Sequence, residues 1–598
     1  MARLTVAPAI VVLGAGALPV AERIRARYQG ATIHALAGRA EGDVAFSELG
    51  AHLRALYARG NPVVALCAAG IVIRCVAPCL ADKGVEPPVL AVAEDGSAVV
   101  PLLGGLTGVN LLAREIAETL GIAPAITTSG ELRFGACVLN PPEGYALADI
   151  GAGKRFVSDL LAGANTRVDG AAPWLEGVAL PVDAAGSHAI RVTPRRAGGA
   201  GSGELLIHPR SVVVALAEGF AHRAASLAAP AQAADHEAGG DPLARRILDA
   251  LAAADLSPLA LAALVAPRQC MREAALARAA RELGVPLRFV ASEADPAGDA
   301  AALLDAALAA GSIDASPAIT LDDHGKPSKS LAIAIAEAPV DANRLGQARG
   351  SLTVLGLGPG RADLLAPAAR LALAEATDIL GYATYVRMAG PFRADQRVHE
   401  TDNREELQRA RHAFELAAQG HRVAMVSSGD PGVFAMAAAV LEALDGAGEP
   451  AWDEVALEVV PGVSAAFATA AEAGAPLGHD FCVISLSDNL KPWGVIEERL
   501  ALAARADLVM AFYNPISKAR PWQLDRALEI LREIRAADTV VVLGRDVGRP
   551  GASLRSLTLG ELRAADVDMR TMVIVGSSKT RRFASAEREW IYTPRFYD

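Results

Sequence analysis

The sequence predicts an α/β protein with several domains. The chain has 598 residues, which is too many for one hydrophobic core. Short apolar runs alternate with longer Ala-rich helical patterns, an order typical of parallel sheets with helices on their faces. The order strand, glycine-rich turn, helix is sharpest between Val423 and Ala471. Such turns lie at the carboxyl edge of an α/β sheet, where ligands bind, so this stretch predicts the main ligand site.

Composition excludes several classes of function. Hydrophobic residues make up 52% of the chain but aromatic residues only 4%, which indicates packing between helices rich in Ala and Leu. The net charge of -11 argues against a nucleic-acid partner, because phosphate neutralisation needs a surplus of Lys and Arg. The six cysteines form no CxxC pair, so we expect no disulfide framework and no metal. Cys75 and Cys79 could share a helix face, but we interpret them as small apolar residues.

The chain shows no apolar run of about 18 residues, so we expect no membrane partner. Its first residues could pass for a signal peptide. We interpret them instead as a buried strand, Ala9–Leu13, followed by a glycine turn and a helix to Tyr28. A cytoplasmic protein is therefore expected.

Residues 1–125 alternate strand and helix patterns, with further strands at Val63–Leu66 and Val89–Val92. We predict a parallel sheet for this region. The turns Gly14–Gly16 and Gly104–Gly105 could bring backbone amides near an anion, but neither completes a dinucleotide-binding fingerprint.

The pattern loosens over residues 126–204, where only a short helical element at Gly151–Ala162 is visible, and becomes regular again over residues 205–340. In these regions the sequence predicts strands at Ser211–Leu216 and Leu287–Val290, helices at Leu243–Ala254 and Met271–Leu283, loops at Arg195–Gly203 and Ala229–Asp241, and a linker at Glu337–Gly350.

From Leu352 the chain carries its strongest signals. A strand at Leu352–Leu355 enters the turn Gly356–Arg361, which begins like a phosphate-binding loop. Pro359 has no amide proton to offer a phosphate, and Arg361 occupies the position of the third glycine. A ligand without phosphate is therefore favoured, and S-adenosylmethionine fits.

The turn at Ser427–Gly432 suits that ligand as well. Gly429 and Gly432 permit close approach of the backbone to a sulfonium group. Asp430 could bond ribose hydroxyls or the amino group of such a ligand. The alternative is that its carboxylate bonds the backbone of its own turn.

Ala68–Arg74, Leu102–Asn110 and Glu282–Phe289 resemble the cobalt-precorrin-5A hydrolases, which open a lactone on a macrocycle and release a two-carbon fragment. Where that family has a histidine, this chain has Gly105, which cannot activate water. Where the family has a turn with Cys and Arg, this chain reads Ala215–Gly219. The resemblance implies a hydrolase-like domain at residues 1–125, a middle region at 126–204 and a second hydrolase-like domain at 205–340.

A series of segments in residues 351–598 resembles the tetrapyrrole methyltransferases, and within them the C(17) branch that methylates precorrin-3B: Leu355–Gly360, Ser427–Phe434, Val460–Ala465, Ala475–Phe481, Ile484–Asp488, Phe512–Pro515 and Val573–Ser577. The resemblance implies a two-lobed α/β methyltransferase with S-adenosylmethionine held between its lobes. It also implies contraction of the ring to precorrin-4, in corrin biosynthesis. The residues that it assigns to the cofactor are Pro359, Gly429, Asp430, Val433, Ser464, Ala465, Tyr513 and Met572.

The same resemblance names candidates for the chemistry. Methyl transfer is an in-line displacement that mainly needs alignment, whereas ring contraction needs groups that move protons. We predict His479, Asp480, Tyr513 and Lys518 for these roles. The substrate carries carboxylate arms, for which Arg520, Arg545, Arg549 and Arg581 are the predicted partners, the alternative being a solvated charged surface.

Three hypotheses remain for the amino-terminal half. It is a hydrolase-like module that holds or passes on intermediates, a second enzyme that still hydrolyses a lactone, or a binding module for neighbouring pathway proteins. A truncation near Val340 would separate them. The partners expected of the whole chain are a precorrin, a second copy of the chain in a homodimer, and other corrin-pathway enzymes at handover.

Overall fold

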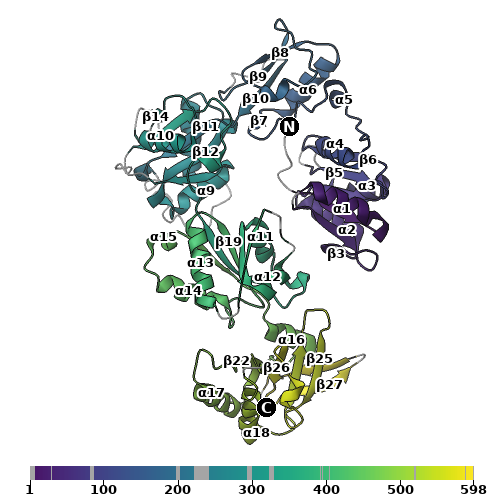
Figure 1. The fold of residues 1–598 in the computed structure, drawn as a ribbon, viewed down its shortest axis with the longest axis vertical. Helices are drawn as coiled ribbons and strands as arrows, with labels where there is room; N and C mark the ends of the chain where they lie inside the picture. The colour runs from purple at the N-terminus through teal and green to yellow at the C-terminus, as the bar shows by residue number, and fades with distance from the viewer. Residues whose placement is uncertain are drawn as a thin grey trace. The chain divides into compact units, whose positions relative to one another are not determined.

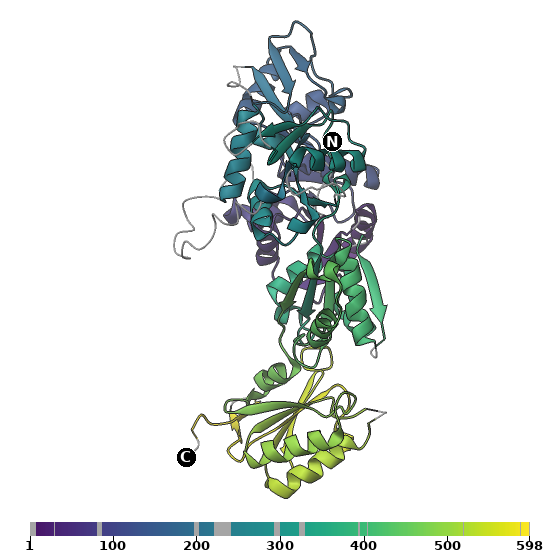
Figure 2. The same cartoon turned by 90° about the vertical axis from the view of Figure 1, so that its left-hand side faces the viewer.

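The computed structural model describes residues 7–28, 30–80, 86–196, 203–220, 241–291, 299–321, 329–390, 392, 395–402, 405–517, 520–585 and 588–596. The chain divides into two compact units, Met1–Arg349 with Phe392–Asp395 and Gly350–Pro391 with Gln396–Asp598, called unit 1 and unit 2 below. Figures 1 and 2 show their elements in two views. The predicted loop around Ala229 and most of the loop at Arg195–Gly203 lie outside the described residues.

The first sheet of unit 1 has the order β3-β2-β1-β4-β5-β6. Its strands are β1 Ala9–Val12, β2 Thr32–Leu36, β3 Val44–Phe46, β4 Val63–Leu66, β5 Val89–Val92 and β6 Val99–Leu103. The first five run parallel, as predicted, but β6 pairs antiparallel with β5. The connection between β5 and β6 is a short turn around Gly96, and a parallel pairing would need a long crossover.

Helices cover both faces of this sheet: α1 Leu18–Arg27, α2 Leu49–Ala58, α3 Ala69–Val76 and α4 Val109–Leu120. Alternate strand residues enter two cores, because side chains along a strand point to opposite faces. Ile10 packs with α1 and α4 on one face, and Val11 packs with α2 and α3 on the other.

The middle of unit 1 holds a second sheet, which the sequence analysis missed, with the order β7-β10-β9-β8. Its strands are β7 Tyr145–Leu147, β8 Thr166–Asp169, β9 His188–Val192 and β10 Glu204–Pro209. Two helices pack with it, α5 Ser129–Phe134 and α6 Ile150–Leu161, and only α6 was predicted.

The third sheet of unit 1 has the order β13-β12-β11-β15-β14. Its strands are β11 Val212–Leu216, β12 Leu261–Pro267, β13 Leu287–Val290, β14 Ile319–Leu321 and β15 Leu331–Ile335. Helices α8 Pro242–Ala253 and α9 Ala274–Leu283 cover one face, and α10 Ala300–Gly311 covers the other.

The segment Glu337–Gly350 was predicted to be a linker, but all of it except Gly350 is part of unit 1. Gln347 pairs with Phe289 of β13 through two backbone hydrogen bonds of 2.7 and 2.9 Å. The Arg288 guanidinium donates to the Ala342 carbonyl at 2.6 Å, and the Leu345 side chain is fully buried. The segment therefore extends the edge of the third sheet rather than hanging free.

Unit 2 begins with a parallel sheet of order β18-β17-β19-β16-β20. Its strands are β16 Ser351–Gly356, β17 Asp378–Tyr382, β18 Arg397–Thr401, β19 Arg422–Ser427 and β20 Ala456–Val460. The helices of this half are α11 Pro367–Glu375, α12 Ala383–Ala389, α13 Glu406–Ala418, α14 Met436–Asp445 and α15 Pro450–Asp453.

The second half of unit 2 has a mixed sheet of order β22-β23-β26-β24-β25 and a small one of order β21-β28-β27. The strands are β21 Gly474–Ala475, β22 Phe481–Ser485, β23 Val509–Tyr513, β24 Val540–Arg545, β25 Ser553–Thr558, β26 Thr571–Val575, β27 Arg581–Ser585 and β28 Arg588–Tyr592. Helices α17 Trp493–Arg505 and α18 Gln523–Ile534 pack on one face of the larger sheet, and α16 Ala465–Ala473 packs on the other.

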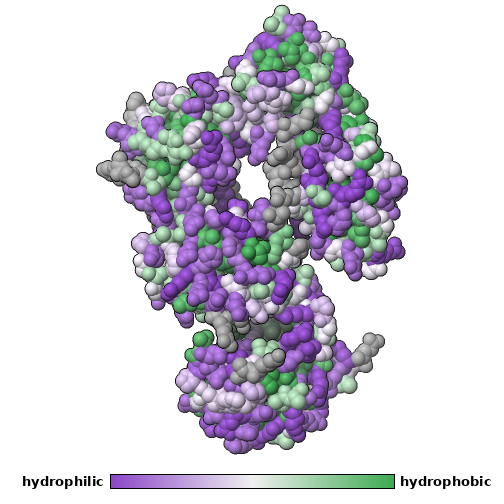
Figure 3. Space-filling model, viewed as in Figure 1, coloured by the Kyte–Doolittle hydropathy of each residue, from purple (hydrophilic) through white to green (hydrophobic). Residues whose placement is uncertain are grey.

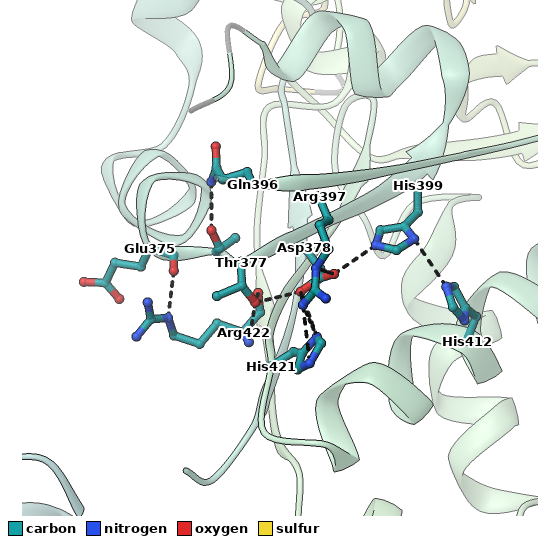
Figure 4. A network of polar contacts seen from close by, with 10 residues as sticks. Glu375, Thr377, Asp378, Gln396, Arg397, His399, His412, His421 and Arg422 are labelled. Carbon is teal, nitrogen blue, oxygen red and sulfur yellow. Dashed lines mark hydrogen bonds and ion pairs between the residues drawn. The ribbon is translucent and has the colours of Figure 1, made fainter. Parts of the chain in front are cut away.

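A buried carboxylate ties three strands of unit 2 together. Asp378, the first residue of β17, is fully buried and accepts hydrogen bonds from Thr377 at 2.7 Å, His399 at 2.9 Å and His421 at 3.0 Å (Figure 4). The guanidinium of Arg397 forms an ion pair with it at 3.0 Å. Because these partners come from β18 and from the residue before β19, the network fixes the amino ends of the three strands.

The surface in view in Figure 3 is largely hydrophilic, with hydrophobic residues in small groups. Scattered exposed apolar residues are normal on a protein surface. Among the described residues, no helix combines the length and the hydropathy that a membrane span requires.

Candidate functional site

The candidate site of unit 2 lies at the carboxyl edge of its parallel sheet. Strand β16 lies between β19 and β20, and Gly356 pairs with Ser427 while Leu355 pairs with Val460. The three strands therefore end side by side. The loops that follow them, here called the β16 loop (357–361), the β19 loop (428–434) and the β20 loop (461–464), meet at this edge.

Three glycines allow the loops to meet so closely. A Cβ at Gly356 or at Gly462 would collide with the Gly429 carbonyl oxygen. Gly429 also has a φ of 71°, a left-handed conformation that favours glycine, and it exchanges two backbone hydrogen bonds with Gly358, at 2.9 and 3.2 Å. The edge is thus built of main chain, which leaves room for a ligand to approach the backbone.

Asp430 holds two of these loops together. Its two carboxylate oxygens accept hydrogen bonds from the amides of Gly432, at 2.8 Å, and Gly462, at 3.0 Å. The structure thus favours the alternative for this residue, in which the carboxylate bonds backbone. Val433 follows in the same turn, and its amide bonds the Asp430 carbonyl at 3.3 Å.

Ser464, Ala465, Tyr513 and Met572 come together at the start of α16. Ser464 is buried, and its side chain caps the helix by accepting from the Phe467 amide at 3.5 Å. The Tyr513 hydroxyl accepts a hydrogen bond from the Ala466 amide at 3.2 Å. Met572 belongs to the same apolar cluster as Ala465 and Tyr513. These predicted cofactor residues therefore surround the first turn of one helix.

Pro359 and Arg549 are partners of each other. The Arg549 guanidinium donates to the Pro359 carbonyl at 2.9 Å and to the Ser428 hydroxyl at 3.0 Å. Arg549 was predicted to bind substrate carboxylates. In the structure its guanidinium links the β16 loop to the β19 loop. These two hydrogen bonds hold the loops together at the edge.

Sequence reasoning missed an aromatic and a lysine at this edge. Phe434 has a φ of 52°, rare for a bulky residue, and its half-exposed ring lies 5.4 Å from that of Tyr513. The Lys491 ammonium lies 5.9 Å from the Phe434 ring centre. Burial, helped by the charge of Arg499, lowers the pKa of Lys491 below its usual value. The signal for Phe434 was its place in the turn that holds Gly429.

A polar cluster continues the edge beyond Tyr513. The Asn514 amide donates to Ser485 at 3.0 Å, and Arg520 donates to Ser487 at 2.8 Å. Among the described residues the Arg520 Nε is buried without a hydrogen-bond partner. Arg520, a predicted substrate residue, thus contacts the segment that follows β22 and carries a donor with no partner among the described residues. The serines and Asn514 were visible in the motifs but were not singled out.

The other predicted residues lie elsewhere or are not described. His479 and Asp480 precede β22, whereas Tyr513 ends the neighbouring parallel strand, whose Val509 pairs with Phe481. A strand of this length separates its two ends by about 13 Å. His479 and Asp480 therefore lie at the opposite edge of the sheet from Tyr513. Lys518 lies outside the described residues.

Two further predicted substrate arginines differ in position. Arg545 ends β24 beside Gly544, which pairs with Met572, so it lies at the same end of its sheet as Tyr513, but its guanidinium is already paired. Arg545 forms ion pairs with Asp568 at 2.9 Å and with Asp546 at 3.3 Å. Arg581 is exposed on β27 of the small sheet. Across the described part of the chain, no three His, Cys, Asp or Glu side chains are grouped so that they could hold a metal.

Comparison with known proteins identifies the family of this unit. Residues 351–563 match the tetrapyrrole (corrin/porphyrin) methylases. The chain is 53% identical over 249 residues to a precorrin-3B C(17)-methyltransferase of Sinorhizobium sp., and the match covers 42% of this chain and 97% of that protein. The chain belongs to the tetrapyrrole methylases. It is therefore a methyltransferase with an additional amino-terminal unit.

Other known proteins match the methyltransferase domain, and one family matches part of unit 1. The cobalamin biosynthesis protein CobIJ of Mycobacterium tuberculosis strain H37Rv is 45% identical over 285 residues, 47% of this chain, and the chain spans about half of its length, 54%. A solved structure of the methyltransferase CobJ is 52% identical, with a TM-score of 0.39 over 41% of this chain and all of that one. In unit 1, residues 51–131 match the family "Cobalamin synthesis G N-terminal".

Proposed function

We propose that the chain transfers a methyl group from S-adenosylmethionine to carbon 17 of precorrin-3B, with contraction of the ring to precorrin-4, in corrin biosynthesis. The observation that carries this proposal is the identity of 53% to a methyltransferase of that name across nearly all of its length. The geometry of the carboxyl edge supports it, because the edge offers backbone instead of side chains to a ligand.

The edge suits a sulfonium ligand without phosphate. Pro359, Gly429, Val433, Ser464 and Ala465 would hold S-adenosylmethionine through their main chain, and Tyr513 and Met572 would close the pocket on the apolar side. Asp430 acts as a positioning residue, because both of its oxygens are engaged by amides. The positive end of α16 suits the methionine carboxylate. When bound, the cofactor supplies the electrophilic methyl group.

On the substrate side, two cations support the proposal: Arg520, which donates to Ser487, and Lys491, whose ammonium lies 5.9 Å from the centre of the Phe434 ring. They would receive carboxylate arms of the macrocycle, with Arg520 giving paired donors. Lys491, whose pKa is lowered, is a candidate to accept the hydroxyl proton during ring contraction, and Tyr513 is a candidate to donate a proton. His479 and Asp480 have no place at this edge, so their predicted catalytic role is not part of the proposal.

A pair of glycine variants tests the site. Gly429→Ala and Gly448→Ala place the same methyl group on a left-handed backbone, at φ values of 71° and 62°. The strain is about 1 kcal/mol in both. Only Gly429 lies at the edge, so we expect Gly429→Ala to lower methyl transfer on the order of 100-fold, because misplacing a reactant has that effect. Gly448→Ala should stay within about twofold, since nothing lies near its new Cβ.

The measurement is the mass of precorrin-3B after incubation with the purified chain and S-adenosylmethionine, together with calorimetric titration of the cofactor. A mass increase of one methyl group is the expected result. No mass change together with no heat of cofactor binding would reject the proposal. Equal losses in both glycine variants would reject the assigned site while leaving the reaction intact.

We infer a homodimer of this enzyme through the edge strand β22. Phe481 and Val483 are half-exposed on this strand, and the Phe467 ring of α16 lies 6.0 Å from that of Phe481. An exposed apolar edge strand is a ready surface for pairing with another chain. Handover of the product to other enzymes of corrin synthesis completes the proposed set of partners.

Unit 1 has a second candidate function, favoured by the match of residues 51–131 to a cobalamin-synthesis family. We infer that it acts on the same class of macrocycle, as a lactone hydrolase or as a module that holds intermediates. Release of acetaldehyde from cobalt-precorrin-5A by the full chain would support hydrolysis. Its absence would leave the holding role.

A further inference from the structure

Unit 1 contains a cavity of about 380 Å³, lined by residues of the turn after β6 and of α5 and α6. Its walls are mostly apolar and include Leu106, Phe134, Val138, Val157 and Leu161. A volume of this size with apolar walls is typical of a small-molecule pocket. None of the residues assigned to methyl transfer lies in it.

A small side pocket of about 40 Å³ adjoins the cavity. The two share Gly105, Glu131, Ala136 and Cys137 as walls. The side pocket is large enough for a carbonyl group or a water molecule. Burial is the main cause that raises the pKa of the Cys137 thiol, so this thiol stays uncharged.

The side pocket offers a hydrogen-bond donor without a partner, while the carboxylate acceptors in its wall are already engaged. Glu131 is 3% exposed, and its two oxygens accept from Asn110 and from Arg114, both at 2.6 Å. Its acceptors are therefore engaged and its charge is paired. Trp174, which also lines this pocket, has an indole nitrogen that is buried and finds no hydrogen-bond partner among the residues that the structure describes. An indole N–H can only donate, and a buried donor without a partner calls for an acceptor.

We propose that this cavity binds a small apolar molecule, or an apolar arm of a larger one, that carries a carbonyl oxygen. The apolar body fills the main chamber, and the carbonyl oxygen accepts the hydrogen bond of Trp174 in the side pocket. A carboxylate is disfavoured there, because Glu131 lies in the same wall and Arg114 is already paired with it. The site is separate from that of methyl transfer and belongs to a different unit.

Two probes of equal shape test the proposal on the full chain: 4-fluoroacetophenone and 4-fluoro-α-methylstyrene, in which a CH₂ group replaces the carbonyl oxygen. Binding is followed by ligand-observed ¹⁹F NMR. We expect both to bind and the ketone to bind about fivefold more tightly, the worth of one neutral hydrogen bond. Equal affinities, or no binding of either probe, would overturn the proposal.

Two variants locate the binding. A side chain at Gly105 meets nothing within 4 Å, so Gly105→Phe should fill the cavity and weaken both probes by at least about tenfold. Gly16→Phe is the matched control, because Gly16 is equally open but lines neither pocket. Trp174→Phe keeps the ring and removes the donor, so it should abolish the preference for the ketone and leave the hydrocarbon unchanged. Loss of binding in Gly16→Phe alone, or an unaltered preference in Trp174→Phe, would contradict the assignment.

Discussion

Asp378 shows how one buried carboxylate can organise the amino ends of three strands. Burial alone would raise its pKa, but hydrogen bonds from His399, Thr377 and Arg397 and the charge of His421 outweigh that effect and lower the pKa below its usual value. A carboxylate with a lowered pKa stabilises the fold above its unfolded pKa of about 4, and the contribution is lost as pH falls through the folded value.

Asp378→Asn removes this charge and leaves the partners in place (Figure 4). We expect the free energy of local opening of β17 and β18 to fall by about 3 kcal/mol at pH 7, because a buried ion pair loses one member. The difference from the unchanged protein should begin to shrink as pH falls below about 4 and should disappear only below the folded pKa, where the native carboxylate has also lost its charge. Hydrogen exchange of peptides from these strands measures both effects. A difference that stays constant with pH would contradict this account.

Single residues of the site were predictable where a backbone conformation demanded them. Gly429 could be found because a turn between a strand and a helix at a sheet edge needs glycine. Lys491 could not be found in this way, since it reaches Phe434 only through the fold, across more than fifty positions of the chain. For the same reason the separation of His479 from Tyr513 was invisible until the two strands were seen to run parallel.

At the level of elements, β22 combines two properties that are rarely left exposed together. It is the edge strand of its sheet, and Phe481 and Val483 are half-exposed on it. Natural edge strands usually carry charge or are covered. This strand lacks such protection within the described residues of unit 2, which is why we assign it to the dimer contact.

Val483→Lys places a charge in the middle of that strand. We expect the protein to sediment as a monomer, because a buried unpaired ammonium in the contact weakens association by several kcal/mol. Leu502→Lys is the control, since Leu502 is an exposed apolar residue on α17 and has no place in the contact. Dimers that persist in Val483→Lys, or monomers in the control, would move the interface elsewhere.

Most long elements were predictable, and short strands were not. The apolar runs at Val63–Leu66 and Leu287–Val290 are strands with the predicted bounds. The sheet of β7 to β10 was missed because β7 has only three residues, and β8 has four that mix polar with apolar side chains. The antiparallel pairing of β6 with β5 follows from the short connection between them. The antiparallel pairing of β15 with β11 joins strands far apart in the sequence, and the hydrophobic periodicity of a strand does not reveal its neighbour.

The whole molecule consists of two units that meet in sequence at Gly350, ten residues later than the truncation point considered from sequence alone. Residues 342–347 contact β13 and include the buried Leu345. A fragment that begins at Val340 would therefore keep this segment of unit 1 without the strand on which it packs. The boundary lies where β16 begins.

A fragment of residues 350–598 should retain methyl transfer within about twofold of the full chain, because each unit has its own cores. A fragment that starts at Val340 should be less soluble, since it exposes Leu345 and unpaired backbone groups. Steady-state assays and light scattering compare the two. A tenfold or greater loss in the fragment that starts at Gly350 would assign unit 1 a part in methylation.

The glycine contacts at the carboxyl edge also determine which parts of this enzyme can accept substitutions. Gly356 and Gly462 lie so close to the Gly429 carbonyl oxygen that neither can carry a side chain without separating the strands, and Gly429 has a left-handed backbone that favours glycine. Variation in the accepted macrocycle must therefore arise in the second half of unit 2, around Lys491 and Arg520, where side chains instead of backbone face the edge. Mutant libraries aimed at new tetrapyrroles belong there, while the three turns should be left untouched.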